Sequence, residues 1–229
     1  MIPKNNKYTI MQEKYYHSGT SNHEEHNVNP LYWGILLRDI IAEPEKWTDK
    51  NALDFGCGKG RNVINMAHLA QWNRVDGVDI SEGNIKFCEE QYKGVKDKVH
   101  WYLNNGIDLE IVPSDTYDFV MATIVFQHIC IYEIRFALLK EIYRTMRDGG
   151  IFRFQMGFDK DNGSRAIVKY HENFYDAPAT NSGCDTRVDD PQYIKNDLEK
   201  IGFKNIEFII TQSFSDHVHP QWIYTRCEK

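Results

Sequence analysis

Residues 52–61 read Ala52-Leu53-Asp54-Phe55-Gly56-Cys57-Gly58-Lys59-Gly60-Arg61, and they are the strongest indication of the fold. An apolar run at 51–55 predicts a short strand, alternating glycines follow it, and residues 61–72 carry apolar side chains at helical spacing. Glycines let the main chain turn sharply and approach a ligand closely, and the start of a helix favours an anionic group. Asp54 adds a carboxylate beside the loop. The stretch therefore predicts a binding loop for a zwitterionic ligand.

The glycine spacing disfavours one well-known class of ligand. A dinucleotide-binding loop has the pattern Gly-x-Gly-x-x-Gly, in which the third glycine contributes to close packing of the helix. Counted from Gly56 and Gly58, that third glycine would stand at position 61, where this chain has Arg61. A nicotinamide-dependent oxidoreductase is therefore disfavoured. A tight strand-to-helix turn that binds nothing is the alternative reading of the loop.

Strand and helix patterns alternate through the rest of the chain. Strands are predicted over 51–55, 74–78, 99–103, 117–122, 151–156, 203–211 and 221–227, and helices from Asn29-Pro30 to Pro44 and over 61–72, 81–92, 131–147 and 190–201. Asp148-Gly149-Gly150 is expected to end the helix over 131–147. Five strand–helix units and two closing strands predict an α/β fold, with a doubly wound, mostly parallel seven-stranded sheet and helices on both faces. Ligands of such sheets bind at the carboxyl ends of the strands.

The length of 229 residues is appropriate for one domain, and we expect residues 1–229 to form one. Residues 1–29 are polar and are interpreted as an N-terminal arm. Residues 157–188 are rich in Gly, Asn and Asp and are too long for a plain connection, so they are interpreted as an insertion on the substrate side.

Composition excludes several classes of function. The formal net charge is −6, which disfavours nucleic acid as a partner. The sequence lacks a run of 18 apolar residues and an apolar signal core, so we expect neither a membrane partner nor secretion. The five cysteines are widely spaced and predict a cytoplasmic protein with reduced thiols. We expect no metal site, because His217-Val218-His219 lacks a visible third ligand. Nothing in the sequence indicates the oligomeric state.

Residues 53–60 closely resemble the first motif of the class I S-adenosylmethionine-dependent methyltransferases. The resemblance runs from about Leu31 to Met156 and, more weakly, through the last strands. It implies a Rossmann-like fold, S-adenosyl-L-methionine as cofactor and S-adenosyl-L-homocysteine as product. In the first motif it implies cofactor contacts at Asp54, Gly56, Cys57 and Gly58.

Later positions extend the resemblance. Asp79 ends the second predicted strand, where the family's acidic residue binds the ribose hydroxyls, and Ile80 follows it; capping the next helix is the alternative role for Asp79. Asn105-Gly106 replaces the family's acidic and small pair near adenine, and an Asn oxygen can accept the same hydrogen bond. A plain Asn-Gly turn is the alternative there. Thr123, after the fourth strand, is the candidate for a main-chain contact near the methionine part.

Two histidines are candidates for a general base. His128 follows the fourth strand, next to the expected reaction centre, and an ordinary imidazole titrates near neutral pH. A histidine that braces the cofactor loop is the alternative. His171 lies in the insertion beside Tyr170, Phe174 and Tyr175, and a surface loop packed by its own aromatic rings is the alternative reading. The arm, with Tyr15, Tyr16 and Trp33, is expected to fold over the cofactor.

The sequence therefore predicts a methyltransferase that acts on a hydroxyl or amino group of a small molecule. A non-catalytic S-adenosylmethionine-binding protein is the main alternative. A nucleic-acid methyltransferase is less favoured, because Ala122-Thr123-Ile124-Val125-Phe126 lacks the Asn/Asp-Pro-Pro-aromatic motif of DNA amino-methylating enzymes.

Overall fold

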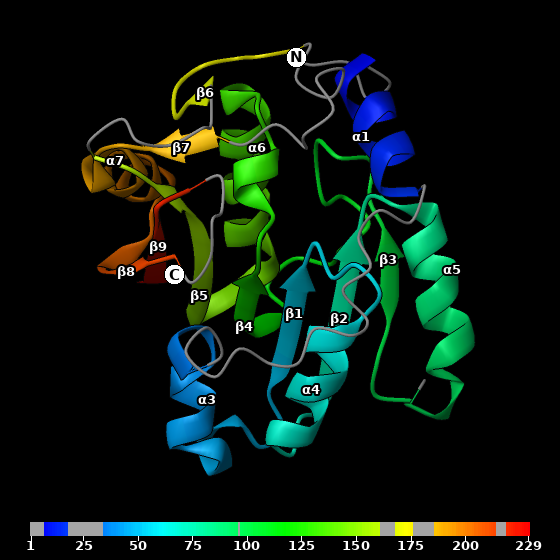
Figure 1. Cartoon of the computed structure of the whole chain (residues 1–229). Coiled ribbons are helices and arrows are strands. Elements are labelled where there is room, and N and C mark those ends of the chain that lie inside the picture. The colour runs from blue at the N-terminus through cyan, green and yellow to red at the C-terminus, as the bar shows by residue number, and fades with distance from the viewer. Residues whose placement is uncertain (1–6, 18–33, 96, 161–167, 176–185, 214–218) are drawn as a thin grey trace.

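Five parallel strands lie side by side in the order β3-β2-β1-β4-β5 (Figure 1). The computed structural model describes residues 7–17, 34–95, 97–160, 168–175, 186–213 and 219–229. The strands are β1 (Asn51–Phe55), β2 (Arg74–Asp79), β3 (Trp101–Leu103), β4 (Tyr117–Ala122) and β5 (Met146–Phe158). The chain order reverses between β1 and β4, and the carboxyl ends of both strands point to the same end of the molecule.

Helices cover both faces of this sheet. One apolar cluster joins one face to side chains of α3 (Arg38–Ala42), α4 (Arg61–Leu69) and α5 (Glu82–Gln91). A second cluster joins the other face to α6 (Tyr132–Thr145) and α7 (Pro191–Ile201). The remaining helices are α1 (Lys7–His17), which packs against α5, and the short 3₁₀ segments η1 (Pro44–Trp47), η2 (Lys93–Val95) and η3 (Phe126–His128). None of the helices in the described ranges is long and apolar enough to cross a membrane.

Strand β5 is longer than its neighbour β4 and pairs with three strands. Along one edge it pairs antiparallel with β9 (Gln221–Glu228), which pairs in turn with β8 (Lys204–Gln212). Along its other edge it pairs first with β4 and then, at Gly157 and Phe158, with β7 (Thr186–Val188). Strand β6 (Val168–Lys169) adds to β7. The strands of the predicted insertion therefore lie beyond the carboxyl end of β4.

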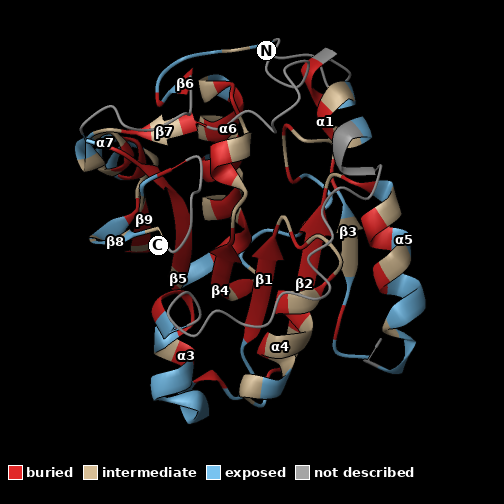
Figure 2. Cartoon of the chain, viewed as in Figure 1, coloured by how far each residue is buried: buried red, intermediate tan, exposed pale blue. Residues whose placement is uncertain are grey.

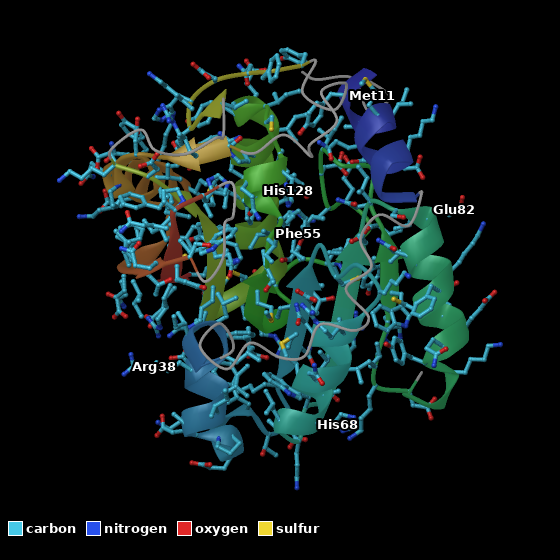
Figure 3. All side chains as sticks on the ribbon, viewed as in Figure 1. Met11, Arg38, Phe55, His68, Glu82 and His128 are labelled. Carbon is cyan, nitrogen blue, oxygen red and sulfur yellow. The ribbon has the colours of Figure 1, made fainter. Side chains whose placement is uncertain are left out.

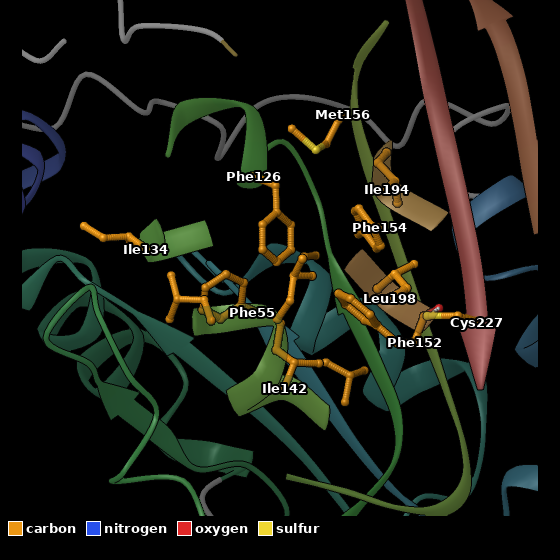
Figure 4. Packing of buried hydrophobic residues seen from close by; sticks show 14 of the residues in the cluster. Phe55, Phe126, Ile134, Ile142, Phe152, Phe154, Met156, Ile194, Leu198 and Cys227 are labelled. Atoms are coloured by element: carbon orange, nitrogen blue, oxygen red, sulfur yellow. Dashed lines mark hydrogen bonds between the residues drawn. The ribbon is translucent and has the colours of Figure 1, made fainter. Parts of the chain in front are cut away.

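Aromatic rings fill the core beneath this end of the sheet (Figure 4). The ring of Phe126, in η3, lies 5.4 Å from that of Phe55 and 5.2 Å from that of Phe154. Figure 2 shows the central strands as almost wholly buried and the outer faces of the helices as exposed. Because Phe126 is 1% exposed and packed on three sides, η3 is anchored to the sheet at its first residue.

The α/β architecture is confirmed, with two differences. The sheet has nine strands among the described residues instead of seven, because the segment 157–188 contributes β6 and β7. Helix α6 ends at Thr145, and Asp148-Gly149-Gly150 belongs to β5. The pairing of β4 with β5 shifts register there: Tyr117 is opposite Met146, but Phe119 is opposite Ile151. The glycines therefore accommodate a bulge in a strand, and the prediction that they end the helix was wrong.

Candidate active site

A cavity of about 180 Å³ opens at the carboxyl ends of β1, β2 and β4. Segments from six parts of the chain meet in its wall. The lining includes Tyr8, Thr9 and Gln12 of α1, the glycine loop from Phe55 to Lys59, Arg61 and Asn62 of α4, Val78 to Ile80, Asn84, Asn104, Gly106, Thr123 to Val125, His128, Ile129 and Leu138. The cavity thus lies where the topology of the sheet places a ligand.

The glycine loop turns with backbone angles that require glycine. Gly56 has φ +75°, and a Cβ there would lie 2.3 Å from the side chain of Val125. Gly58 has φ +52°, and a Cβ there would meet no atom within 4 Å, because it faces the cavity. The loop bonds back to the sheet, since the N–H groups of Gly56 and Cys57 donate to the carbonyl of Val78 at 2.8 and 3.0 Å. The main chain at Gly58 is therefore open to a ligand.

Asp54 is the buried carboxylate of the site. It is 0% exposed, and neither of its oxygens has a hydrogen-bond partner within the described ranges. Burial raises the pKa of Asp54 to about 8; the charge of Arg61 and the nearby amide of Asn62 oppose this shift, while Asp79 adds to it. A buried carboxylate without a partner is costly unless a cation or a hydrogen-bond donor is supplied. Asp54 lies behind the lining residues and is suited to receive such a group.

Asp79 is held rigidly at the end of β2. Its Oδ1 accepts hydrogen bonds from the N–H of Ser81 at 2.9 Å and from the amide of Asn84 at 3.3 Å. Its Oδ2 accepts from the N–H of Gly58 at 2.8 Å. Ser81 caps α5 with its own hydroxyl, which accepts from the N–H of Asn84, so that role does not fall to Asp79. The N–H of Ile80 also hydrogen-bonds to this carboxylate, so main-chain and amide donors fix its orientation at the cavity wall.

The structure separates the roles of two neighbouring asparagines. The Oδ1 atom of Asn105 accepts from the N–H groups of Ile107 and Asp108, at 2.9 and 3.0 Å, and closes a turn. Asn104 instead lines the cavity, is 8% exposed, and its Oδ1 has no partner within the described ranges. Gly106 also lines the cavity, with φ +76°. Of the predicted pair, Gly106 therefore lines the cavity and Asn105 does not, whereas its neighbour Asn104 does.

The chain after β4 turns through a strained residue. Thr123 lines the cavity, and its hydroxyl oxygen has no partner in the described part of the chain. Ile124 follows with φ +55°, a left-handed conformation that is rare for a β-branched residue. This turn brings Val125 over the glycine loop, where it packs against Gly56. The close packing of Val125 thus holds this strained turn of the cavity wall in place.

His128 lies at the end of η3 and lines the same cavity (Figure 3). Its ring is half-buried, and its Nε2 atom lies 3.5 Å from the side-chain nitrogen of Gln127. Phe126 anchors the start of η3 in the core. His128 is therefore brought to the carboxylates of the cavity by a short, anchored segment.

His171, the second candidate base, lies elsewhere. Its ring packs edge-on against Tyr132, Tyr170 and Tyr193, with centroid distances of 5.0, 5.0 and 4.7 Å. It is exposed and is not among the residues that line the cavity. The structure thus brings His128, but not His171, to the candidate site.

Helix α1 closes the cavity with residues that the sequence pattern does not single out. The hydroxyl of Tyr8 donates to the carbonyl of His128 at 3.0 Å and accepts from the N–H of Cys130 at 2.7 Å. The amide of Gln12 donates to the same hydroxyl and to the same carbonyl, at 3.0 and 3.1 Å. Tyr15 and Tyr16 belong to α1, but their side chains, all of Trp33 and His217 lie outside the described part of the chain.

Sequence reasoning missed Asn104, Tyr8 and Gln12. The signal for Asn104 was its place directly after β3, one residue closer to the strand than the residue chosen. For Tyr8 and Gln12 the only signal was the i, i+4 spacing of two side chains in the arm.

Known proteins resemble this chain in sequence. Residues 53–154 match a family model described as a methyltransferase domain. An O-methyltransferase, rstn1, of Aspergillus nomiae is 26% identical over 178 residues, which are 76% of this chain and 72% of the relative. A carboxy-S-adenosyl-L-methionine synthase of Campylobacter curvus is 23% identical over 145 residues. That match spans 62% of this chain and only 59% of the relative's length.

Solved structures share the fold. The geranyl diphosphate C-methyltransferase of Streptomyces coelicolor, solved with Mg²⁺, geranyl diphosphate and S-adenosyl-L-homocysteine, superposes with a TM-score of 0.65 at 11% identity, covering 98% of both chains. An S-adenosylmethionine-dependent methyltransferase of Mesorhizobium loti superposes with a TM-score of 0.63 at 15% identity, covering 84% of this chain and 96% of its own.

Proposed function

We propose that this chain is a class I S-adenosylmethionine-dependent methyltransferase that methylates a hydroxyl or amino group of a small molecule, because residues 53–154 match the methyltransferase-domain model and solved methyltransferases share the fold. The observation that carries the proposal is the shared cavity: the glycine loop, Asp79 and His128 all line it. A base and the cofactor-binding groups thus meet in one enclosed space.

The residues present fit S-adenosylmethionine. Asp54 offers to an ammonium group a buried carboxylate whose oxygens have no hydrogen-bond partner within the described ranges, and Asp79 offers to a ribose hydroxyl a carboxylate fixed at the cavity wall. Asn104 offers a buried amide oxygen to the amino group of adenine, and Gly58 leaves the main chain open to the ligand. When bound, the cofactor supplies an electrophilic methyl group. The work of the protein is then to position the acceptor, exclude water and remove a proton.

His128 is the residue that we assign to proton removal. It is the one histidine among the described residues in the cavity lining, and a neutral imidazole can accept a proton from a hydroxyl or ammonium group near neutral pH. Thr123 lines the same cavity and contributes a hydroxyl without a partner in the described ranges. His171 has no part in this proposal, because it packs among tyrosines outside the lining.

A small acceptor is supported by the closure of the cavity. Helix α1 packs over it through Tyr8, Thr9 and Gln12, and β6–β7 extends the sheet beyond the end of β4. The geranyl diphosphate C-methyltransferase is named for a small substrate, and it shares the fold of this chain. The relative from Aspergillus nomiae is named as an O-methyltransferase. The proposal includes a cytoplasmic location, which the four described cysteines, all free thiols, support.

Two measurements test the proposal. Calorimetric titration should show binding of S-adenosyl-L-homocysteine and none of NAD. Methyl-labelled S-adenosylmethionine should then transfer label to members of a panel of phenols, alcohols and amines. His128→Asn should abolish most of the transfer and leave S-adenosyl-L-homocysteine affinity within about threefold, and His171→Asn is the matched control that should leave both unchanged. Binding without transfer to any panel member would instead favour a non-catalytic binding protein.

A further inference from the structure

The three residues His128, Ile129 and Cys130 form a short connection whose main chain is held by side chains from elsewhere. The N–H groups of His128 and Ile129 bond within η3, to the carbonyls of Val125 and Phe126. The carbonyls of His128 and Ile129 and the N–H of Cys130 instead bond to side chains of α1 and α6. A single turn of 3₁₀ helix does not fix the direction of the residues that follow it. The orientation of the connection therefore depends on these side chains.

Tyr8 holds the connection from the side of the cofactor cavity. Its side chain is 2% exposed, and burial raises the pKa of Tyr8, so the hydroxyl keeps its proton. That hydroxyl donates to the carbonyl of His128 and accepts from the N–H of Cys130, which binds both ends of the connection to one atom. Gln12 donates to the same carbonyl and to the same hydroxyl.

Helix α1 docks through these polar contacts and through the ring of Tyr8, which belongs to the apolar core. Among the side chains of α1 that the structure describes, Tyr8, Thr9 and Gln12 are buried, whereas Ile10 is 55% exposed. A helix of 11 residues is marginal on its own, so α1 is stable only while it is docked. Since the same three side chains line the cavity, docking of α1 both closes the cavity and fixes the main chain at His128.

Arg135 holds the connection from the opposite side. It lies in α6, is 1% exposed, and donates to the carbonyls of Ile129 and Tyr170 and to the hydroxyl of Thr186 at 3.2 Å. Tyr170 and Thr186 belong to the segment that carries β6 and β7. Its guanidinium also lies 5.0 Å from the ring of Tyr170. Arg135 thus joins the inserted strands to the residue next to His128.

We propose that Tyr8 and Arg135 are positioning residues for His128, which hold its main chain from two sides so that the imidazole faces the cavity only when α1 and the inserted strands are both docked. The inference rests on the proposed function for the role of His128, but its geometry does not. Tyr8 couples the position of the imidazole to closure over the cofactor. Arg135 couples it to the segment expected on the acceptor side.

The test follows the imidazole of His128 by NMR in the complex with S-adenosyl-L-homocysteine. The Cε1–Hε1 signal is assigned by its loss in His128→Asn. Tyr8→Phe removes only the hydroxyl; it should shift this signal and raise the Kd for S-adenosyl-L-homocysteine roughly five- to fiftyfold. Arg135→Lys keeps the charge but loses the forked donor; it should shift the same signal with a smaller change in Kd, because Arg135 is not in the lining.

Tyr117→Phe is the matched control. Tyr117 is also buried, and its hydroxyl donates to Asp76 at 2.5 Å, but it starts β4 at the end of the sheet away from the cavity. It should lower stability and leave the His128 signal in place. An unchanged His128 signal in folded Tyr8→Phe protein, or an equal shift in Tyr117→Phe, would overturn the proposal. Failure of the proposed function would appear differently, as methyl transfer that persists in His128→Asn.

Discussion

The main-chain N–H of Gly58 donates a hydrogen bond of 2.8 Å to Oδ2 of Asp79, across 21 residues of sequence. This bond joins the glycine loop after β1 to the carboxyl end of β2. Asp79 therefore shapes the loop as well as lining the cavity.

Replacing Asp79 tests this double role. Asp79→Ala should weaken binding of S-adenosyl-L-homocysteine by about 1.5–3 kcal/mol, because the ribose loses an acceptor and the N–H of Gly58 loses its partner. Asp79→Asn should bind S-adenosyl-L-homocysteine nearly as weakly as Asp79→Ala, because the amide nitrogen of the new side chain would face a main-chain N–H donor on one side. Calorimetry on the three proteins provides the measurement, and wild-type affinity in Asp79→Ala would remove Asp79 from the site.

Adjacent asparagines provide a second test with its own control. Asn104→Ala should lower affinity for S-adenosyl-L-homocysteine roughly tenfold, because the buried Oδ1 that faces the cavity is lost. Asn105→Ala should lower the free energy of unfolding by about 1 kcal/mol instead, because it opens the turn closed on the N–H groups of Ile107 and Asp108. The reverse pattern, with affinity lost at Asn105, would assign adenine to the other side chain.

These two residues show what sequence can and cannot reveal. The loop at Gly56–Gly60 and the carboxylates Asp54 and Asp79 follow from local pattern, because a strand, glycines and a helix start occupy one continuous stretch. The choice between Asn104 and Asn105 depends on which side chain closes the turn, and that depends on main-chain geometry. Tyr8 lies 122 residues from its partner Cys130, and its role arises only when α1 docks on the folded sheet.

The raised pKa of Asp54 predicts a pH dependence of ligand binding. With a pKa of about 8, Asp54 is mostly protonated at pH 7 in the free protein, whereas an ammonium group of the ligand requires it ionised. Binding should therefore release a proton, and affinity should fall by up to about tenfold per pH unit below pH 8. Calorimetry at pH 6.5 in two buffers of different ionisation enthalpy measures the proton. Asp54→Asn should release none.

The same shift predicts that Asp54 lowers stability. The native pKa lies above the ordinary 3.8, so between about pH 4 and 8 unfolding releases a proton and stability falls as pH rises, by at most about 1.4 kcal/mol per unit from this group. Asp54→Asn should therefore unfold at higher urea concentration than the wild type at pH 8, and the advantage should shrink at pH 5. An equal difference at both pH values would argue that the native carboxyl is ionised throughout.

Backbone strain at Ile124 gives a further prediction. Replacing Ile124 by glycine removes the strain of its φ of +55°, and this gain offsets part of the stability lost with the packing of the side chain. Ile129 is a matched control, because it is also half-buried and lines the cavity, but its own φ is −91°. Ile124→Gly should cost about 1–2 kcal/mol less in urea unfolding than Ile129→Gly. Equal costs would indicate that the turn at Ile124 stores no strain.

The extra length of β5 has a consequence for changing what the protein accepts. One edge of β5 pairs with β4 as far as Phe154 and with β7 from Gly157 onward. The inserted strands therefore join the sheet without changing the hydrogen bonds that pair β1, β2 and β4. The inserted strands are therefore separable from the cavity, and we expect a segment transplanted from another enzyme onto this edge to leave the residues that line the cavity in place. Such a graft must bring its own oxygen acceptors for Arg135, or a buried cation loses its partners next to His128.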